Sequence, residues 1–220
     1  MSATVARLVR IPADSVHIEG MLALPDRAQG VVLFAHGSGS SRHSPRNNYV
    51  AEVLQQCGIG TLLMDLLTPQ EDMDARARFD IALLTGRLLA ATHWVQAENA
   101  AKNLPIGYFG ASTGAAAALQ AAAQPGLEIG AIVSRGGRPD LAGQEDLEKV
   151  KSPTLLLVGG LDDVVIELNR AAYACMNCIK ELSIIPGATH LFEEPGTLER
   201  VAQQAAAWFS RHLEGPHSAR

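Results

Sequence analysis

The chain alternates short apolar runs with stretches whose apolar residues recur at helical spacing. Runs that are mainly apolar and of strand length occupy residues 31–35, 61–64, 106–109, 129–134, 154–158 and 182–185. Such runs are typical of strands covered by helices on both faces. Between them, helical spacing predicts helices near residues 49–57, 81–95, 115–123, 145–150, 165–176 and 201–209. This alternation predicts the α/β class, with an open, mostly parallel sheet and helices on both faces.

Other segments depart from this alternation. Ala6 to Ile11 and Ser15 to Leu24 alternate loosely around a Pro-Ala-Asp turn and predict two antiparallel edge strands. Residues 66–80 are polar and acidic and predict a loop, and the tail from Glu214 to Arg220 is expected to fray. Residues 135–153 have room for about one short helix, so we expect little or no lid and an open site for small, soluble substrates.

Composition narrows the class of protein. The 220 residues, 47% hydrophobic and 19% charged, predict one soluble domain over residues 1–220. The net charge of −5, without a Lys/Arg cluster, argues against a nucleic-acid partner. No apolar run has signal-peptide or membrane-spanning length, and three cysteines indicate a reducing, cytoplasmic location without disulfides. We expect no metal, because the acidic segment lacks a convincing ligand spacing.

Polar loops follow five predicted strands, at the ends marked by Ala35, Phe109, Ser134, Val158 and Ile185. In an open parallel sheet, ligands bind outside the carboxyl ends of the strands. These loops are therefore expected to meet at one edge of the sheet and form a single active site.

The loop from Gly110 to Gly114 reads G-x-S-x-G, with Ser112 at its centre. A strand before it and a helix after it predict a nucleophile elbow, although a serine that only caps the helix is the alternative. A serine nucleophile needs a base and a carboxylate that orients the base. Asp162 and His190 follow in the chain order expected on this fold, and Asp163 competes with Asp162 for the carboxylate role.

Four stretches together resemble α/β-hydrolases of the dienelactone hydrolase-like type. They are His36-Gly37-Ser38-Gly39, the elbow, Gly159-x-x-Asp162-x-x-Val165 and Gly187-Ala188-Thr189-His190-Leu191-Phe192, and the resemblance covers about Ala6 to Leu213. Dienelactone hydrolase itself has a cysteine nucleophile, so a serine here indicates an ordinary serine esterase. Residues 36–47 also resemble a bacterial subgroup, some of whose members are fused to a phosphoribosyltransferase domain.

The resemblance implies a role for each site residue. Ser112 would attack an acyl carbonyl, His190 would act as general base and then general acid, and Asp162 would orient the imidazole. The backbone N–H groups of Ser38 and Thr113 would form the oxyanion hole.

Three further side chains are candidates for binding substrate. His36 is expected mainly to shape the oxyanion loop by hydrogen bonding. Arg135 and Arg138 could pair with a substrate carboxylate, and ion pairs with Asp140 or solvation are at least as favoured. The overall prediction is a serine hydrolase that cleaves small esters or lactones without a cofactor. A thioesterase or amidase, and a non-catalytic member that binds an acyl ligand or a protein, stay open as alternatives.

Overall fold

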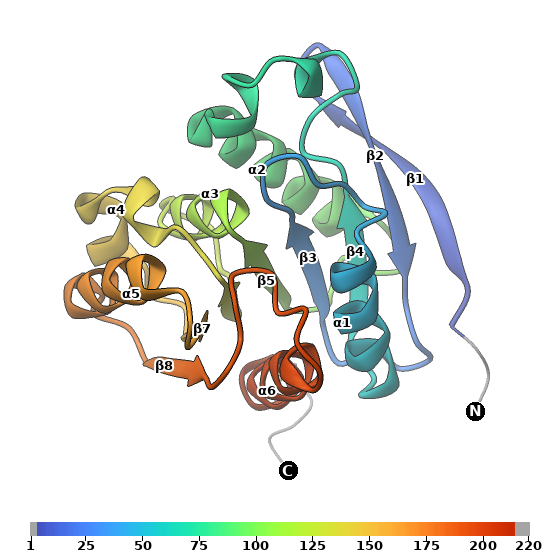
Figure 1. Cartoon of the computed structure of the whole chain (residues 1–220). Helices are drawn as coiled ribbons and strands as arrows, with labels where there is room; N and C mark the ends of the chain where they lie inside the picture. The colour runs from blue at the N-terminus through green and yellow to red at the C-terminus, as the bar shows by residue number, and fades with distance from the viewer. Residues whose placement is uncertain (1–3, 214–220) are drawn as a thin grey trace.

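The computed structural model describes residues 4–213, so the tail from Glu214 onward lies outside the described residues. Its eight strands form one sheet in the order β1-β2-β4-β3-β5-β6-β7-β8 (Figure 1). The strands are β1 (Ala6–Ala13), β2 (Val16–Ala23), β3 (Val31–Ala35), β4 (Gly60–Met64), β5 (Ile106–Ala111), β6 (Ala131–Arg135), β7 (Thr154–Gly159) and β8 (Lys180–Ile185).

The six strands from β3 to β8 are parallel, whereas β1 and β2 form an antiparallel hairpin that joins the sheet through β4. The prediction of two edge strands is right for β1 and wrong for β2, which pairs with a neighbour on each side. The chain places β4 on one side of β3 and β5 on the other. In such sheets, ligands usually bind where the strand order reverses, here at the carboxyl ends of β3 and β5.

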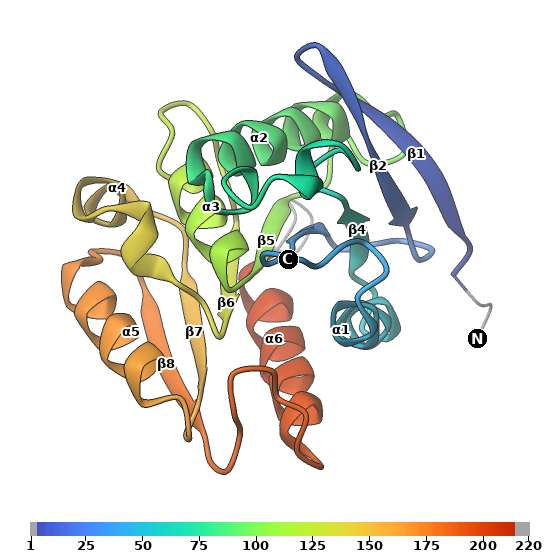
Figure 2. The same cartoon turned by 45° about the horizontal axis from the view of Figure 1, so that its top comes forward.

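Helices cover both faces of the sheet (Figure 2). They are α1 (Pro45–Gln56), α2 (Ile81–Ala97), α3 (Thr113–Ala122), α4 (Gln144–Lys149), α5 (Asp163–Cys175) and α6 (Thr197–His212). Helices α1 and α6 pack on one face, and α2 to α5 lie on the other. Neighbouring residues of β5 point to opposite faces: Phe109 packs on Phe34 toward α1 and α6, and Tyr108 meets Thr92 of α2 at 2.7 Å. The alternating runs predicted an open, mostly parallel sheet with helices on both faces, and this architecture is confirmed.

Two connections between strands differ from the regular strand–helix alternation, namely residues 66–80 and residues 136–153. The segment expected to be a loop contains two 3-10 turns, η1 (Glu71–Met73) and η2 (Ala77–Phe79). It is tied down by Arg87, whose buried guanidinium donates to Glu71 Oε1 at 2.6 Å and to Ala13 O at 2.7 Å. Between β6 and β7, a fully described stretch, lie only the 3-10 turn η3 (Pro139–Ala142) and α4. The expected absence of a large lid is confirmed.

Candidate active site

Ser112 stands at the junction of β5 and α3 with an unusual backbone conformation. Its φ of +50° and ψ of −120° lie in a region that non-glycine residues rarely adopt, so the surrounding structure must hold it there. Its N–H donates to Arg135 O at 3.3 Å, and its carbonyl accepts from Arg138 N at 3.1 Å. The loop after β6 therefore fixes the strained turn that presents the serine at the sheet edge.

The two glycines of the motif are required by close packing. A Cβ on Gly110 would lie 2.4 Å from Ala115 Cα, and one on Gly114 would lie 2.1 Å from Ala35 O. Both distances are far below van der Waals contact. The G-x-S-x-G pattern thus lets β5, α3 and the end of β3 approach closely enough to form the elbow.

Asp162 and His190 come together from the loops after β7 and β8. His190 Nδ1 and Asp162 Oδ2 lie 2.6 Å apart, which leaves the imidazole Nε2 available for another partner. Asp162 is partly buried next to the exposed Asp163, which lies in the first turn of α5. The geometry therefore pairs the histidine with Asp162, the carboxylate that the glycine and valine spacing favours.

The loop that carries His190 is held by local hydrogen bonds. Glu194 accepts from Thr189 N–H at 3.0 Å and from Thr189 Oγ1 at 2.6 Å. These two hydrogen bonds lower the pKa of Glu194, so the carboxylate remains charged and keeps the turn closed. Nothing in the residue pattern pointed to this role for Glu194.

Ser112 and His190 both lie next to the segment at the end of β6, and they are not hydrogen-bonded to each other. Within residues 4–213 no hydrogen bond joins their side chains. Ser112 N–H donates to Arg135 O, and Gly136 is the next residue along the chain. A Cβ built on Gly136 would lie 3.5 Å from His190 Cε1. Hydrogen bonds between nucleophile and base often tighten only when a substrate is bound, so the arrangement is compatible with a Ser-His-Asp triad.

The loop after β3 lies directly against the elbow. A Cβ on Gly37 would lie 3.0 Å from Ser112 Cβ, so the next residue, Ser38, follows immediately beside the nucleophile. Thr113 is the first residue of α3, where a helix leaves its N–H groups unpaired. In the described part of the chain, neither Ser38 N–H nor Thr113 N–H donates to a protein acceptor. Both groups expected to form the oxyanion hole are thus available as donors.

His36 uses both ring nitrogens within the protein. Leu66 N–H donates to Nε2 at 3.0 Å, so Nδ1 carries the proton and donates to Gly37 O at 2.9 Å. Burial lowers the pKa of His36, which favours the neutral ring that this pattern needs. His36 therefore holds the loop after β3 in place by hydrogen bonding, and it has no free nitrogen for a substrate.

Arg42, which the sequence did not single out, holds the far end of the same loop. Its guanidinium pairs with Asp65 Oδ2 through Nη1 and with Glu19 Oε2 through Nη2 at 2.6 Å. Its backbone N–H also donates to Asp65 Oδ1 at 2.7 Å. His36 at the start of the loop after β3 contacts Leu66, and Arg42 farther along the loop contacts Asp65. Because Asp65 and Leu66 are consecutive residues after β4, both ends of the loop are anchored to the same short segment.

Arg138 and Arg135 have different surroundings. Arg138 forms a two-pronged pair with Asp140, at 2.9 Å through Nε and 2.7 Å through Nη2, which is the alternative that the sequence left open. Arg135 is buried on the α1 side of β6 and has no ion pair among the described residues. Of these two arginines, only Arg138 therefore forms an ion pair with a carboxylate.

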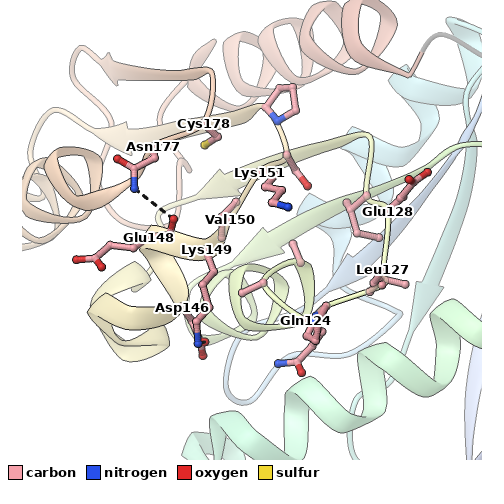
Figure 3. Close-up of a pocket in the computed structure, with 17 residues that line it drawn as sticks. Gln124, Leu127, Glu128, Asp146, Glu148, Lys149, Val150, Lys151, Asn177 and Cys178 are labelled. Atoms are coloured by element: carbon pink, nitrogen blue, oxygen red, sulfur yellow. Dashed lines mark hydrogen bonds and ion pairs between the residues drawn. The ribbon is translucent and has the colours of Figure 1, made fainter.

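A cavity of about 950 Å³ lies at the opposite edge of the sheet (Figure 3). It is formed where α3 and α4 end and β6 and β7 begin, and Asn177 Nδ2 donates across it to Glu148 O at 3.3 Å. It contains none of the predicted site residues. A smaller hollow of about 220 Å³ lies at the active edge, beside His36, Ser40 and Asp65. Of the predicted site residues, only His36 lines the smaller hollow, and none lines the larger cavity.

Residues 4–213 hold no cluster of three or more His, Cys, Asp or Glu side chains that could bind a metal ion. Over the same residues, no helix combines the length and the apolar character needed to cross a membrane.

Known proteins share both the sequence pattern and the fold. The family model described as "Dienelactone hydrolase family" matches residues 18–214. The crystal structure of dienelactone hydrolase from Anabaena variabilis ATCC 29413 is 53% identical, with a TM-score of 0.92, over 96% of this chain and 99% of that chain. Est1E from Butyrivibrio proteoclasticus is 18% identical, with a TM-score of 0.78, over 94% of this chain and 98% of that one. At such low identity, Est1E supports the fold alone.

A longer relative carries a different name. A Mycobacterium tuberculosis (strain ATCC 25618 / H37Rv) protein, named as a candidate phosphoribosyl transferase, is 56% identical over 208 residues. The match covers 94% of this chain and 47% of the relative, so the chain spans about half the length of the curated relatives it matches.

Proposed function

The chain belongs to the dienelactone hydrolase family, and we propose that it is a serine hydrolase that cleaves small carboxylic esters or lactones through an acyl-enzyme. One observation carries this proposal: the 2.6 Å contact of His190 with Asp162 at the sheet edge where Ser112 occupies a strained elbow. The match to the longer relatives spans 208 of the 220 residues, so it includes most of residues 18–214, which the hydrolase family model covers. We therefore assign hydrolysis, and not phosphoribosyl transfer, to these residues.

The proposed mechanism uses this chain's own groups. His190 Nε2 takes the proton from Ser112 Oγ as the oxygen attacks the carbonyl carbon, and Asp162 stabilises the charged imidazole. The N–H groups of Thr113 and Ser38 stabilise the negative oxygen of the tetrahedral intermediate, each contributing about 3 kcal/mol. His190 then protonates the leaving group, and the same steps with water release the acid from Ser112.

Substrate size follows from the open edge. Only η3 and α4 separate β6 from β7, so no large lid supplies an apolar tunnel for a long acyl chain. The free cysteines of the described chain are compatible with a reducing compartment, and we propose that small, soluble cytoplasmic esters are the substrates.

Hydrolysis of p-nitrophenyl esters from acetate to octanoate tests the proposal. The wild type should cleave the short esters, with kcat/KM falling as the chain lengthens. Ser112→Ala should lose a factor of about 10⁴ or more in kcat, and Asp162→Asn a factor of about 10³–10⁴. Asp163→Asn, one residue away, is the matched control and should keep its activity. A folded wild type without activity toward any member would favour a binding protein, and an unchanged Asp162→Asn enzyme would contradict the triad.

A further inference from the structure

The segment that holds Ser112 in its strained turn is itself held by a side chain of another helix. Ser112 N–H donates to Arg135 O at 3.3 Å, and Ser112 O accepts from Arg138 N–H at 3.1 Å, two contacts that together we call the clamp. Between the two arginines, Gly137 is buried, and its carbonyl oxygen accepts from Asn169 Nδ2 at 3.0 Å. In the described part of the chain, Gly137 O has no other hydrogen bond. The clamp therefore depends on α5 as well as on the sheet.

Asn169 donates to two carbonyls that belong to different parts of the site. Its side chain is fully buried in α5, and Nδ2 also donates to Val165 O at 2.8 Å, one turn earlier in the helix. Val165 lies in the first turn of α5, which begins at the residue after Asp162. Asp162 O accepts from Ile166 N–H at 2.9 Å, so Asp162 is joined to the same turn. One amide group thus links the clamp of the nucleophile to the helix turn next to the candidate triad carboxylate.

Apolar packing beneath the first turn of α5 is sparse. The buried side chains there form a small cluster, separate from the two large cores and bordered by partly buried side chains of β8: Val158, Val165 and Ile166. The loop after β6 is packed tightly on its other side, since a Cβ on Gly137 would lie 2.6 Å from Ala115 Cβ of α3. Apolar contact is non-directional, whereas a buried hydrogen bond fixes an orientation. The bond from Asn169 therefore sets how the helix turn lies relative to the loop.

The partners of Asn169 determine which way its amide faces. Both are carbonyl oxygens, which accept and do not donate, so Nδ2 must point at them. The buried Oδ1 is then left without a hydrogen-bond partner. Leucine at this position would remove the unpaired Oδ1 but leave Gly137 O unpaired, so the net change in stability should be small. The main contribution of Asn169 is therefore the placement of the loop.

We propose that Asn169 is a positioning residue, which fixes Ser112 relative to the Asp162–His190 pair by joining the clamp to α5. It acts through Gly137 and has no contact with the substrate. The inference rests on the proposed function, and it concerns a residue outside all the motifs of the candidate site. A displacement of about 1 Å between reacting groups can cost about a hundredfold in rate, so a single buried amide is enough to matter.

Ester kinetics of two variants test this role. Asn169→Leu removes both donated bonds, whereas Asn169→Thr offers one hydroxyl proton, which suits Val165 O one turn back and leaves none for Gly137 O. We expect both variants to lower kcat for p-nitrophenyl acetate by about tenfold to a hundredfold, with KM within about threefold of the wild type. Wild-type kcat in either variant would overturn the proposal.

Thr92→Val is the matched control. It removes another fully buried side-chain hydrogen bond, the 2.7 Å contact with Tyr108 OH on the far side of the core from α5. This variant should lower the Tm at least as much as Asn169→Leu and leave kcat at the wild-type value. A fall in kcat as large as that of Asn169→Leu would mean that any lost buried bond slows the enzyme, and would overturn the specific role of Asn169.

Hydrogen exchange measures the clamp without using activity. In Asn169→Leu, the amide protons of Ser112 and Arg138 should exchange about tenfold faster or more, while those of β3 keep their rates. Faster exchange in β3 as well, or failure of both Asn169 variants to fold, would mean that the residue supports the whole fold and would overturn the proposal. A wild type that cleaves no ester would contradict the proposed function, and the exchange rates would still decide whether Asn169 holds the clamp.

Discussion

The loop after β3 and the end of β6 flank the elbow, and each contains an arginine. In the first loop, Arg42 meets Asp65 and Glu19, so its charge is balanced twice. In the second, Arg135 meets a neutral amide and faces another arginine. An arginine paired with carboxylates can hold a loop in place, whereas a buried arginine without a counter-charge costs stability. The two arginines are therefore expected to affect the stability of the protein in opposite directions.

The largest change should follow from breaking the matched pair. Asp65→Asn leaves Arg42, whose side chain is 17% exposed, with only the partly exposed Glu19 as its counter-charge. We expect the free energy of unfolding to fall by about 2–3 kcal/mol, and kcat for a neutral ester to fall about tenfold because Ser38 N–H loses its position. Urea unfolding and steady-state kinetics measure both.

Glu167→Gln is the control for this variant, because it breaks an exposed pair with Arg170 and should cost about 0–1 kcal/mol without changing kcat. If Asp65→Asn behaves like this control, the loop does not depend on the pair.

The opposite sign is expected at the unmatched arginine. Arg135→Met replaces a buried, unpaired charge by an apolar chain of similar length, so the free energy of unfolding should stay equal or rise by about 1–2 kcal/mol. Arg42→Met should instead lower it, because two carboxylates lose their partner. Urea unfolding of the two methionine variants compares them directly. A loss of stability in both would remove the distinction between the two loops.

A smaller change in the free energy of unfolding is expected when the pH is lowered, because His36 then becomes protonated in the unfolded chain. Because the pKa of His36 in the folded protein lies below its ordinary value of 6.5, the unfolded chain binds a proton that the folded chain resists. The resulting stability is fully present above pH 6.5 and is lost as the pH falls from there through the lowered pKa of the folded state. Urea unfolding between about pH 5 and 8 should show a steeper loss for the wild type than for His36→Gln, which cannot titrate. Parallel curves would contradict the role of the neutral ring.

The smallest effect is expected at Arg138. Its pair with Asp140 is partly exposed, so Arg138→Met should change the free energy of unfolding by about 0–1 kcal/mol. Its kcat/KM for p-nitrophenyl acetate should stay at the wild-type value. A loss of stability as large as that of Asp65→Asn would show that an exposed pair supports the site as much as a buried one.

The sheet and its helices could be predicted because their signals are local. Continuous apolar runs such as Val31 to Ala35 mark central strands, and glycines around Ser112 mark the elbow, without knowledge of any distant residue. The interior place of β2 was missed, because pairing with β4 involves residues about 40 positions away along the chain. Strand type can be read from alternation, whereas strand neighbours depend on tertiary pairing.

The same limit explains the site. The motifs indicated Ser112, Asp162 and His190, but the anchoring of the oxyanion loop depends on Arg42 and Asp65, which are 23 residues apart. An arginine in a polar loop and an aspartate at a strand end are common features on their own. By contrast, the pair of Arg138 with Asp140, two residues away, could be anticipated from the sequence, whereas the lack of a counter-charge at Arg135 depends on three-dimensional packing.

Covalent labelling of Ser112 tests the central claim, a serine nucleophile activated by the Asp162–His190 pair, most directly. Wild type, Ser112→Ala and Asp162→Asn are treated with a fluorophosphonate, and the modified peptide is identified by mass spectrometry. The account predicts a single adduct on Ser112 in the wild type, no adduct in Ser112→Ala and much slower labelling of Asp162→Asn. A folded wild type that takes up no label, or a Ser112→Ala protein labelled as fast as the wild type, would contradict it.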